Sequence, residues 1–174
     1  MTVHRPVRLF IATSLDGCIA RADGRVDWLF TDGDYGYAAF YDAVDTVIMG
    51  RRTYDDVLGS GPYPYPGKAG FVFSHSPPAA APEHVTFVSG PPAALVARLR
   101  EAQGKALWLV GGAGLVASFL DADLVDEIIV SVHPRILGAG IPLFPRQGRE
   151  LALELAGVTP FPSGLVQLRY ARRR

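Results

Sequence analysis

The chain has 174 residues, of which 49% are hydrophobic and 20% are charged, a composition typical of a folded domain and not of a disordered chain. The 17 basic and 17 acidic residues give a formal net charge of zero, which argues against a dedicated nucleic-acid binder because such proteins carry a basic surface. The single cysteine, Cys18, excludes an internal disulfide framework, and neither a hydrophobic signal core nor a bilayer-spanning apolar run is present. We expect one domain over residues 1–174, in the cytoplasm and without a membrane or nucleic-acid partner.

The first half of the chain predicts strands that end at turns. Residues 7–14 are mostly apolar and predict a strand buried on both faces. Residues 15–32 predict a long loop, which in a compact domain is more often functional than idle. Within this loop, Trp28 and Leu29 could plug the edge of the core or line a cleft. The helical spacing of aromatic residues predicts a helix over 34–44, followed by a strand over 45–49.

A glycine junction with two arginines follows that strand. The sequence Gly50-Arg51-Arg52-Thr53 precedes a short helix that runs through 55–58. Guanidinium groups beside free helix N–H donors suit a phosphate monoester. The alternative is an exposed basic helix start, although positive charge there opposes the helix dipole and so requires a reason.

A second glycine junction lies between a strand over 106–110 and a helix over 112–120. Its glycine cluster would bring backbone N–H groups to the surface with no side chains in the way, which favours a phosphate or pyrophosphate. A tight turn that needs positive φ explains the same residues equally well. Further strands are predicted over 69–74 and 85–88, and Pro91-Pro92 opens another helix.

The C-terminal part predicts a long strand over 125–133, a glycine-containing loop over 134–145, and an antiparallel pair formed by 151–158 and 165–170. Strands that alternate with helices indicate an α/β protein, and the terminal pair makes the sheet mixed. If the strands with glycine- or serine-containing turns are parallel neighbours, these turns lie at their carboxyl ends, where open α/β sheets bind ligands.

Several chemistries are not supported by the motifs. The four histidines have no metal-ligand spacing, and no G-x-S-x-G sequence indicates a serine nucleophile. Gly61, Gly67 and Lys68 have the wrong spacing for a phosphate-binding P-loop. Gly112-x-Gly114-x-x-Ala117 matches a Rossmann fingerprint only loosely, because the next strand does not end in the acidic residue that such a site uses.

Five motifs in order resemble dihydrofolate-reductase-like proteins, and most closely the reductase domain of the bacterial riboflavin-biosynthesis deaminase–reductase and its stand-alone relatives. The resemblance covers nearly the whole chain and rests on residues 14–20, 50–53, 72–74, 111–114 and 136–144. It implies a three-layer fold, in which helices flank a mixed, mostly parallel sheet with an antiparallel C-terminal strand pair. It also implies an NADPH-dependent reductase of a small pterin- or pyrimidine-like heterocycle, and a homodimer. The zinc-ligand signature of the deaminase half is absent.

Carried over by position, the resemblance assigns cofactor contacts. Gly50, Arg51, Arg52 and Thr53 would bind the 2′-phosphate and pyrophosphate side, with one of the arginines as phosphate clamp. Ser74 and His75 would follow the adenine ribose, and Ala12, Ile19 and Trp28 would border the nicotinamide. The pyrophosphate and nicotinamide ribose would be held by the segment Val110, Gly111, Gly112, Ala113, Gly114 and Leu115, in which relatives often have a cis Gly–Gly peptide.

The proton donor is less well defined. Folate-reducing relatives use a carboxylate shortly after the loop that carries the Trp, and here Asp32, Asp34 and Asp27 lie nearby. We take Asp32 and Asp27 as catalytic candidates and Asp16 as a substrate contact, and each could instead be a solvated loop carboxylate or a helix cap. A substrate with a ribose phosphate would need basic contacts, for which Arg21, Arg25 and Arg135 are candidates. Two rival hypotheses are a non-catalytic nucleotide-binding module and a conventional Rossmann oxidoreductase.

Overall fold

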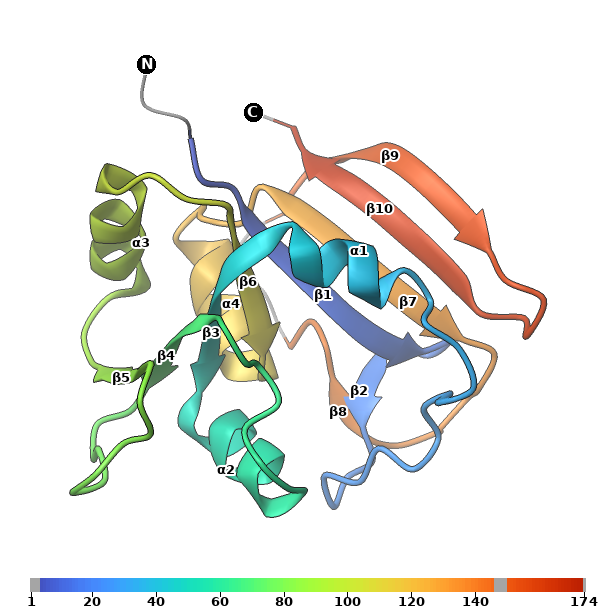
Figure 1. Ribbon diagram of the computed structural model, residues 1–174. Coiled ribbons are helices and arrows are strands. Elements are labelled where there is room, and N and C mark those ends of the chain that lie inside the picture. Colours follow the sequence, from blue (N-terminus) through green and yellow to red (C-terminus); the bar gives the residue numbers. More distant parts are fainter. Residues whose placement is uncertain (1–3, 146–149, 174) are drawn as a thin grey trace.

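A computed structural model describes residues 4–145 and 150–173, which form one eight-stranded sheet with helices on both faces (Figure 1). The strand order is β5-β4-β3-β6-β1-β7-β10-β9, and β2 and β8 form a separate small sheet. In chain order the elements are β1 (Val7–Ser14), β2 (Cys18–Ala20), α1 (Tyr37–Asp42), β3 (Val44–Gly50), α2 (Arg51–Gly59), β4 (Ala69–Phe73), β5 (Val85–Val88), α3 (Pro92–Glu101), β6 (Ala106–Gly111), α4 (Ala113–Asp121), β7 (Glu127–His133), β8 (Ile141–Pro142), β9 (Leu153–Pro160) and β10 (Val166–Arg172).

The main sheet is mixed and mostly parallel, as predicted. Strands β5, β4, β3, β6, β1 and β7 all pair in parallel, whereas β10 pairs antiparallel with both β7 and β9. Strands β3, β6 and β1, which end in Gly50, Gly111 and Ser14, are neighbours. Their carboxyl ends therefore meet at one edge of the sheet, which is the condition for a ligand site there.

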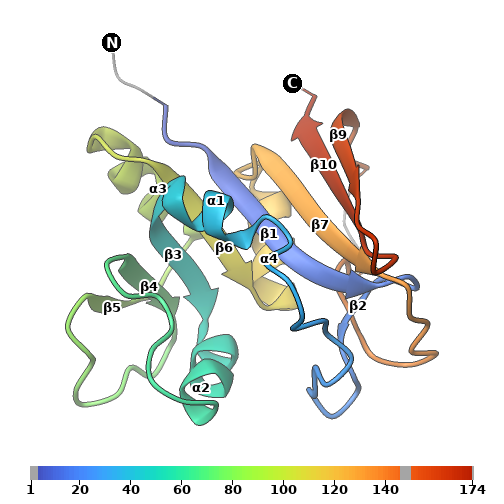
Figure 2. The same ribbon diagram turned by 45° about the vertical axis from the view of Figure 1, so that its right-hand side comes forward.

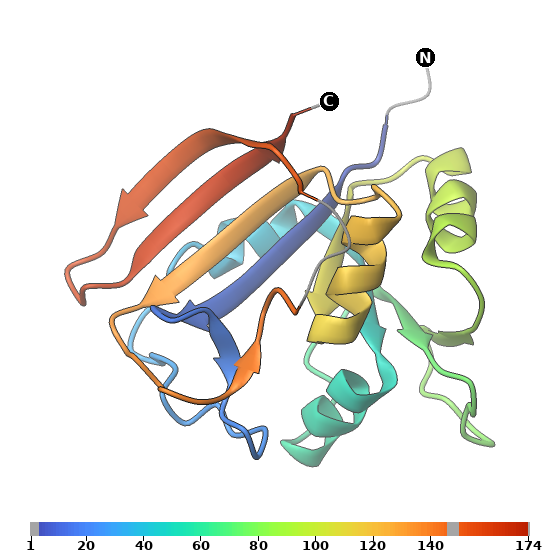
Figure 3. The same ribbon diagram turned by 180° about the vertical axis from the view of Figure 1, so that it is seen from behind.

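Helices cover both faces of the sheet and give it two cores. Helix α1 lies on one face, and the view from behind shows α3 and α4 on the other (Figure 3). In β3, Ile48 packs into the core beneath α3 and α4, and its neighbours Val47 and Met49 pack into the core beneath α1. This alternation explains why the central strands are continuous apolar runs. None of the helices within the described residues combines the length and apolar character that a membrane-spanning helix needs.

Two details differ from the sequence-based expectation. The predicted loop over 15–32 contains β2, which pairs with β8 inside the predicted loop over 134–145. Strands of three and two residues are too short to show an alternating pattern, and only the tertiary pairing defines them. The predicted helix over 34–44 is shortened to α1, because Val44 is fully buried as the first residue of β3.

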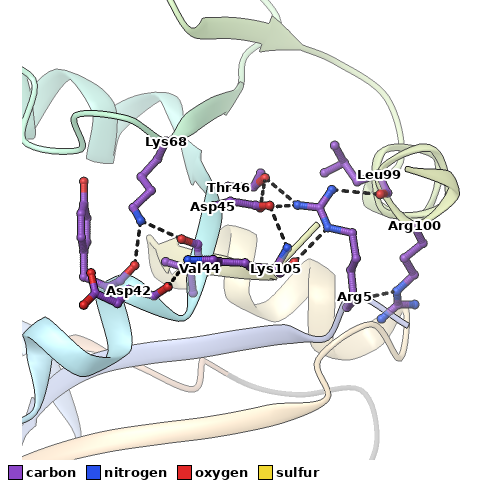
Figure 4. Close-up of polar contacts among 10 residues, drawn as sticks. Arg5, Asp42, Val44, Asp45, Thr46, Lys68, Leu99, Arg100 and Lys105 are labelled. Atoms are coloured by element: carbon purple, nitrogen blue, oxygen red, sulfur yellow. Dashed lines mark hydrogen bonds and ion pairs between the residues drawn. The ribbon is translucent and has the colours of Figure 1, made fainter. Parts of the chain in front are cut away.

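A polar network closes the amino ends of the parallel strands (Figure 4). The Arg5 guanidinium is buried and donates to the carbonyl oxygens of Lys105 and Leu99, to Thr46 Oγ1 and to the Asp45 carboxylate. The other Asp45 oxygen accepts the Lys105 N–H at 2.8 Å. Each nitrogen of this buried cation therefore has an acceptor, which is the condition under which a buried charge is tolerated.

Candidate active site

A cleft of about 1120 Å³ lies at the carboxyl ends of β1, β3 and β6. Figure 2 shows these strands ending together near α2 and β2. One side of the cleft is the sheet edge with the starts of α2 and α4, and another is formed by the loop after β2. The lining is Ile11, Ala12, Ile19, Ala20, Asp23, Gly24, Arg25, Val26, Leu29, Gly50, Arg51, Arg52, Thr53, Asp55, Asp56, Val57, Gly59, Ser60, Gly61, Pro62, Pro64, Val110, Gly111, Gly112, Ala113, Gly114, Leu115 and Ile141.

The starts of α2 and α4 lie beside each other in this cleft. Their N-cap residues are Gly50 and Gly112, and neither helix has a side-chain cap or an acidic residue in its first turn. A Cβ atom added to Gly50 would lie 4.0 Å from the backbone O of Gly111 and 4.0 Å from the backbone N of Gly112. The first N–H groups of each helix have no intrahelical acceptor, so two positive helix ends converge on one place. Such a place suits the phosphates of a nucleotide.

The glycine junction also leaves little room for side chains. A Cβ atom on Gly112 would approach Thr53 Oγ1 to 3.2 Å, and Gly111 has φ of 136°, in the range that favours glycine. The Gly111–Gly112 peptide bond is cis, as the family resemblance implied. Thr53 can therefore lie this close to Gly112 because glycine has no Cβ atom. The missing side chain also leaves the backbone N–H groups at this junction accessible.

The two arginines of α2 point to different places. Arg51 pairs with Asp55, with Nε 2.8 Å from Oδ1, and donates through Nη1 to the backbone O of Ser76 at 2.9 Å. Arg52 has no hydrogen bond or ion pair with any described residue, and its Nη2 lies 3.4 Å from where a Cβ on Gly24 would be. Arg51 is therefore directed toward the end of β4, and Arg52 toward the loop after β2.

Most of the predicted cofactor residues meet in the cleft. Those that line it are Ala12, Ile19, Gly50, Arg51, Arg52, Thr53, Val110, Gly111, Gly112, Ala113, Gly114 and Leu115. Ser74 and His75 are not in the lining, but they follow β4 directly and adjoin Ser76, which contacts Arg51. Those two residues are thus beside the cleft, on the side toward which Arg51 points.

Trp28 is placed differently from the prediction. Its side chain is only 5% exposed and packs edge-on against the His133 ring, with centroids 5.2 Å apart. His133 Nε2 accepts the N–H of Phe30 at 3.2 Å, and burial lowers the pKa of this histidine. The sequence left two alternatives open for Trp28 and its neighbour Leu29. Trp28 packs in the core, and Leu29 lines the cleft.

The predicted catalytic carboxylates are held outside the described cleft lining. Asp27 pairs with Arg21, with 2.6 Å between Oδ1 and Nε, and this hydrogen bond lowers the Asp27 pKa. Asp32 accepts the hydroxyl of Tyr35 at 2.7 Å, which raises the Tyr35 pKa. Asp34 accepts the N–H of Ala38 at 2.9 Å at the start of α1. The structure therefore does not bring these groups together with the predicted cofactor residues.

Asp16 braces a loop. Its carboxylate accepts the Ser14 hydroxyl at 2.6 Å and the N–H groups of Leu137 and Gly138 at 3.1 and 2.9 Å. These bonds, that of Ser14 first and then that of Leu137, lower the Asp16 pKa to about 2. Asp16 is also outside the described lining of the cleft. This geometry explains a structural role for Asp16, and its contact with a substrate stays a prediction.

The sequence analysis assigned no role to the second half of α2 or to the loop that follows it. Asp56, Val57, Ser60, Pro62 and Pro64 all line the cleft. The Pro-rich composition of residues 59–67 indicated a loop but not its placement. The sequence did place Asp56 four residues after Arg52, a spacing that puts both on one side of the helix and so could have predicted that Asp56 faces the cleft.

The sheet order, the antiparallel terminal pair and the cleft define a dihydrofolate-reductase-like α/β protein. A family model of the RibD C-terminal domain matches residues 72–167, and the chain belongs to this family. The uncharacterized protein YwjB of Bacillus subtilis strain 168 is 45% identical, over 98% of this chain and 99% of that one.

Two solved structures support the same fold. A candidate riboflavin biosynthesis protein from Shewanella sp. PV-4 is 32% identical, covers 97% of this chain and 99% of its own, and superimposes with a TM-score of 0.87. Dihydrofolate reductase from Enterococcus faecalis, complexed with NADP(H), is 16% identical and has a TM-score of 0.74 over 99% of this chain and 100% of its own. At that identity the second likeness shows the fold alone.

Proposed function

We propose that the protein is an NADPH-dependent reductase of a small pterin- or pyrimidine-like heterocycle. The observation that carries the proposal is the pair of helix N-termini at Gly50 and Gly112, which lack side-chain caps and lie beside Arg52, a residue without an ion pair to any part of the chain that the structure describes. Backbone donors, helix dipoles and a guanidinium all favour phosphate at this place. The reductase-type family and fold make a nicotinamide dinucleotide the phosphate compound that fits best.

The chain's own residues would bind and orient this cofactor. The starts of α2 and α4 would hold the pyrophosphate, with Arg52 reaching it from the side of Gly24. Arg51 points toward Ser76, which suits a 2′-phosphate on an adenosine placed along Ser74 and His75. Ala12 and Ile19, farther along the cleft, would border the nicotinamide. Bound NADPH would supply the hydride, and the apolar lining would exclude water from the transfer.

The test is a titration of the protein with NADPH and with NADH, read by quenching of the Trp28 and Trp108 fluorescence. We expect clear preference for NADPH. Arg51→Gln should weaken NADPH but leave NADH nearly unchanged, whereas Arg52→Gln should weaken both by roughly 10- to 100-fold, the value of hydrogen bonds to a charged group. Arg98→Gln, an exposed change on α3 outside the cleft, is the matched control.

The rival hypotheses predict other results. Equal binding of NADH and NADPH would favour a conventional dinucleotide oxidoreductase. If both arginine variants lose equal affinity for both cofactors, Arg51 does not bind the 2′-phosphate. Cofactor binding with no oxidation of NADPH in the presence of any pterin or pyrimidine would favour a non-catalytic nucleotide-binding module. No binding of either cofactor would refute the proposal.

We further propose a homodimer, on the basis of the hairpin β9–β10. Leu155 and Val158 of β9 are 56% and 52% exposed. They pair in register with Tyr170 and Leu168 of β10, so that apolar side chains gather on one face of the hairpin. A second copy would remove this face from water. Sedimentation that gives only a monomer mass would refute the homodimer.

A further inference from the structure

The charged side chains of the cleft largely neutralise one another. Asp23 pairs with Arg25 at 2.7 Å, and Arg51 pairs with Asp55 at 2.8 Å. Only Arg52 and Asp56 remain among the charged residues of the described lining, and neither has a hydrogen bond or ion pair through its side chain within residues 4–145 and 150–173. Arg52 and Asp56 are thus the two charged side chains of the described lining that are not already paired with another side chain.

The two unpaired charges occupy different parts of α2. Arg52 lies in the first turn, beside the place proposed for the cofactor phosphates. Asp56 follows four residues later, about 6 Å farther along the helix axis. There the cleft continues along the second half of α2 and the loop after it. We call the lining residues Asp56, Val57, Ser60, Pro62 and Pro64 the α2 wall.

The α2 wall accepts hydrogen bonds but has few donors left. The N–H groups of Ser60 and Gly61 close the helix on the carbonyl oxygens of Val57 and Leu58, both at 3.3 Å. The Ser60 hydroxyl donates to the backbone O of Asp56 at 3.1 Å. Pro62 and Pro64 have no N–H. The Asp56 carboxylate, which only accepts when it is ionised, is therefore the prominent polar group of this wall.

The α2 wall is also unsuited to a phosphate. Three arginines were considered from the sequence as contacts of a ribose phosphate. Arg21 pairs with Asp27, Arg25 pairs with Asp23, and Arg135 is outside the described lining. If Arg52 serves the cofactor, a substrate phosphate placed against the α2 wall would meet the Asp56 carboxylate and no cation of that wall. Charge repulsion and the cost of desolvation both disfavour that arrangement.

From this distribution we infer that the substrate is a flat heterocycle that carries no phosphate and presents N–H donors, from an amino group or a protonated ring nitrogen, to Asp56. This inference rests on the proposed reductase function, because it assigns Arg52 to the cofactor. Val26 and Leu29 contribute apolar lining of the kind that a flat ring requires. Asp56 would then determine specificity, and a phosphoribosylated pyrimidine would be rejected.

The experiment uses calorimetric titration of the protein saturated with NADP⁺. The probes are 2,4-diaminopyrimidine, which presents donors, and uridine and uridine 5′-monophosphate, which differ only in the phosphate. We expect 2,4-diaminopyrimidine to bind, Asp56→Asn to weaken it by about tenfold or more, and the monophosphate to bind more weakly than uridine. Asp42→Asn, which changes an exposed carboxylate on α1 outside the cleft, should have no effect. NADPH affinity should be unchanged in Asp56→Asn, which also shows that this variant is folded.

Other results would overturn the inference. It fails if 2,4-diaminopyrimidine does not bind, if Asp56→Asn leaves its affinity unchanged, or if the monophosphate binds more tightly than uridine. The cofactor titration alone judges the proposed function. If NADP⁺ does not bind, the reductase proposal fails, and the effect of Asp56→Asn on 2,4-diaminopyrimidine without cofactor still decides the role of Asp56.

Discussion

The two ends of the parallel strands carry comparable polar residues but use them in opposite ways. At the amino ends, Arg5 is 4% exposed and each of its guanidinium nitrogens has an acceptor, on β3, on α3 or at Lys105 just before β6 (Figure 4). At the carboxyl ends, Arg52 has no partner among the described residues, and the starts of two helices have no side-chain cap. Satisfied polar groups stabilise the fold, whereas unsatisfied and accessible ones are available to a ligand.

This comparison separates stability from binding along a single sheet. The same apolar strands connect the two ends and are buried on both faces, so they do not account for the difference. The difference lies in the residues that flank them: Arg5, Lys105 and Asp45 at one end, glycines at the other. Substitutions at the amino ends should therefore change the free energy of unfolding, and substitutions at the carboxyl ends should change ligand affinity.

The largest effect is expected for Arg5→Ala. The change removes the Arg5 donor from the partly buried hydrogen bonds to the carbonyl oxygens of Leu99 and Lys105 and from the Asp45 carboxylate. The Arg5 side chain is buried and the Asp45 side chain is 36% exposed, so we take the lower end of the range for a broken buried pair, about 3 kcal/mol. Urea denaturation should show this loss in the free energy of unfolding. The NADPH affinity of the folded fraction should stay at the wild-type value, because the network lies at the far end of the sheet.

Arg98→Ala is the matched control, since this α3 arginine is exposed and its recorded contact is with the Phe71 ring, 5.8 Å from the centroid. Its effect on stability should be within about 0.5 kcal/mol. An Arg5→Ala variant as stable as Arg98→Ala would show that the amino-end network contributes little, and would remove the contrast between the two ends.

The sequence predicted this architecture where the signal was local. Apolar runs gave the main strands, and the junctions at Gly50 and Gly111 gave the position of the cleft. The sequence did not predict β2 and β8, because these short strands are defined only by their pairing with each other. It also could not distinguish Arg51 from Arg52. Each has an aspartate four residues later, yet within residues 4–145 and 150–173 Arg51 is paired and Arg52 is not, because side-chain direction depends on the tertiary surroundings.

The next effect concerns Gly114, in the first turn of α4. This residue lines the cleft, and a Cβ there would meet no atom within 4 Å. Gly114→Asp should leave the fold intact or stabilise it by a few tenths of a kcal/mol, because a carboxylate near a helix N-terminus is favourable. The same charge should repel the cofactor phosphates and weaken NADPH by about tenfold, roughly 1.4 kcal/mol.

Denaturation and fluorescence titration of the same preparation would measure both quantities. Gly114→Ala, which adds a Cβ without charge, should bind NADPH as the wild type does. If Gly114→Asp and Gly114→Ala have equal affinities, the start of α4 does not approach a phosphate, and the proposed binding mode is wrong.

The smallest effect is expected for Asp16→Asn. Asp16 lies at the carboxyl end of β1, but its carboxylate is already hydrogen-bonded within the protein. Asp16 fixes the segment around Leu137 and Gly138 beside the end of β1. Its pKa is about 2 in the folded protein, below the ordinary value of 3.8. A carboxylate with a lowered folded-state pKa contributes stability that is complete above its unfolded-state pKa and is lost as the pH falls through the folded-state value.

The urea midpoint of the wild type should therefore exceed that of Asp16→Asn at pH 5 to 7. The gap should shrink as the pH falls below the ordinary value of 3.8 and disappear only below the folded-state pKa of about 2. Other carboxylates titrate in both proteins, so their contributions cancel in the difference. A gap that stays constant from pH 6 to pH 2 would mean that the hydrogen bonds of Asp16 do not depend on its charge. NADPH affinity should change little, since Asp16 braces the loop from outside the cleft, and a large loss of affinity would instead place Asp16 in the binding site, as the sequence had suggested.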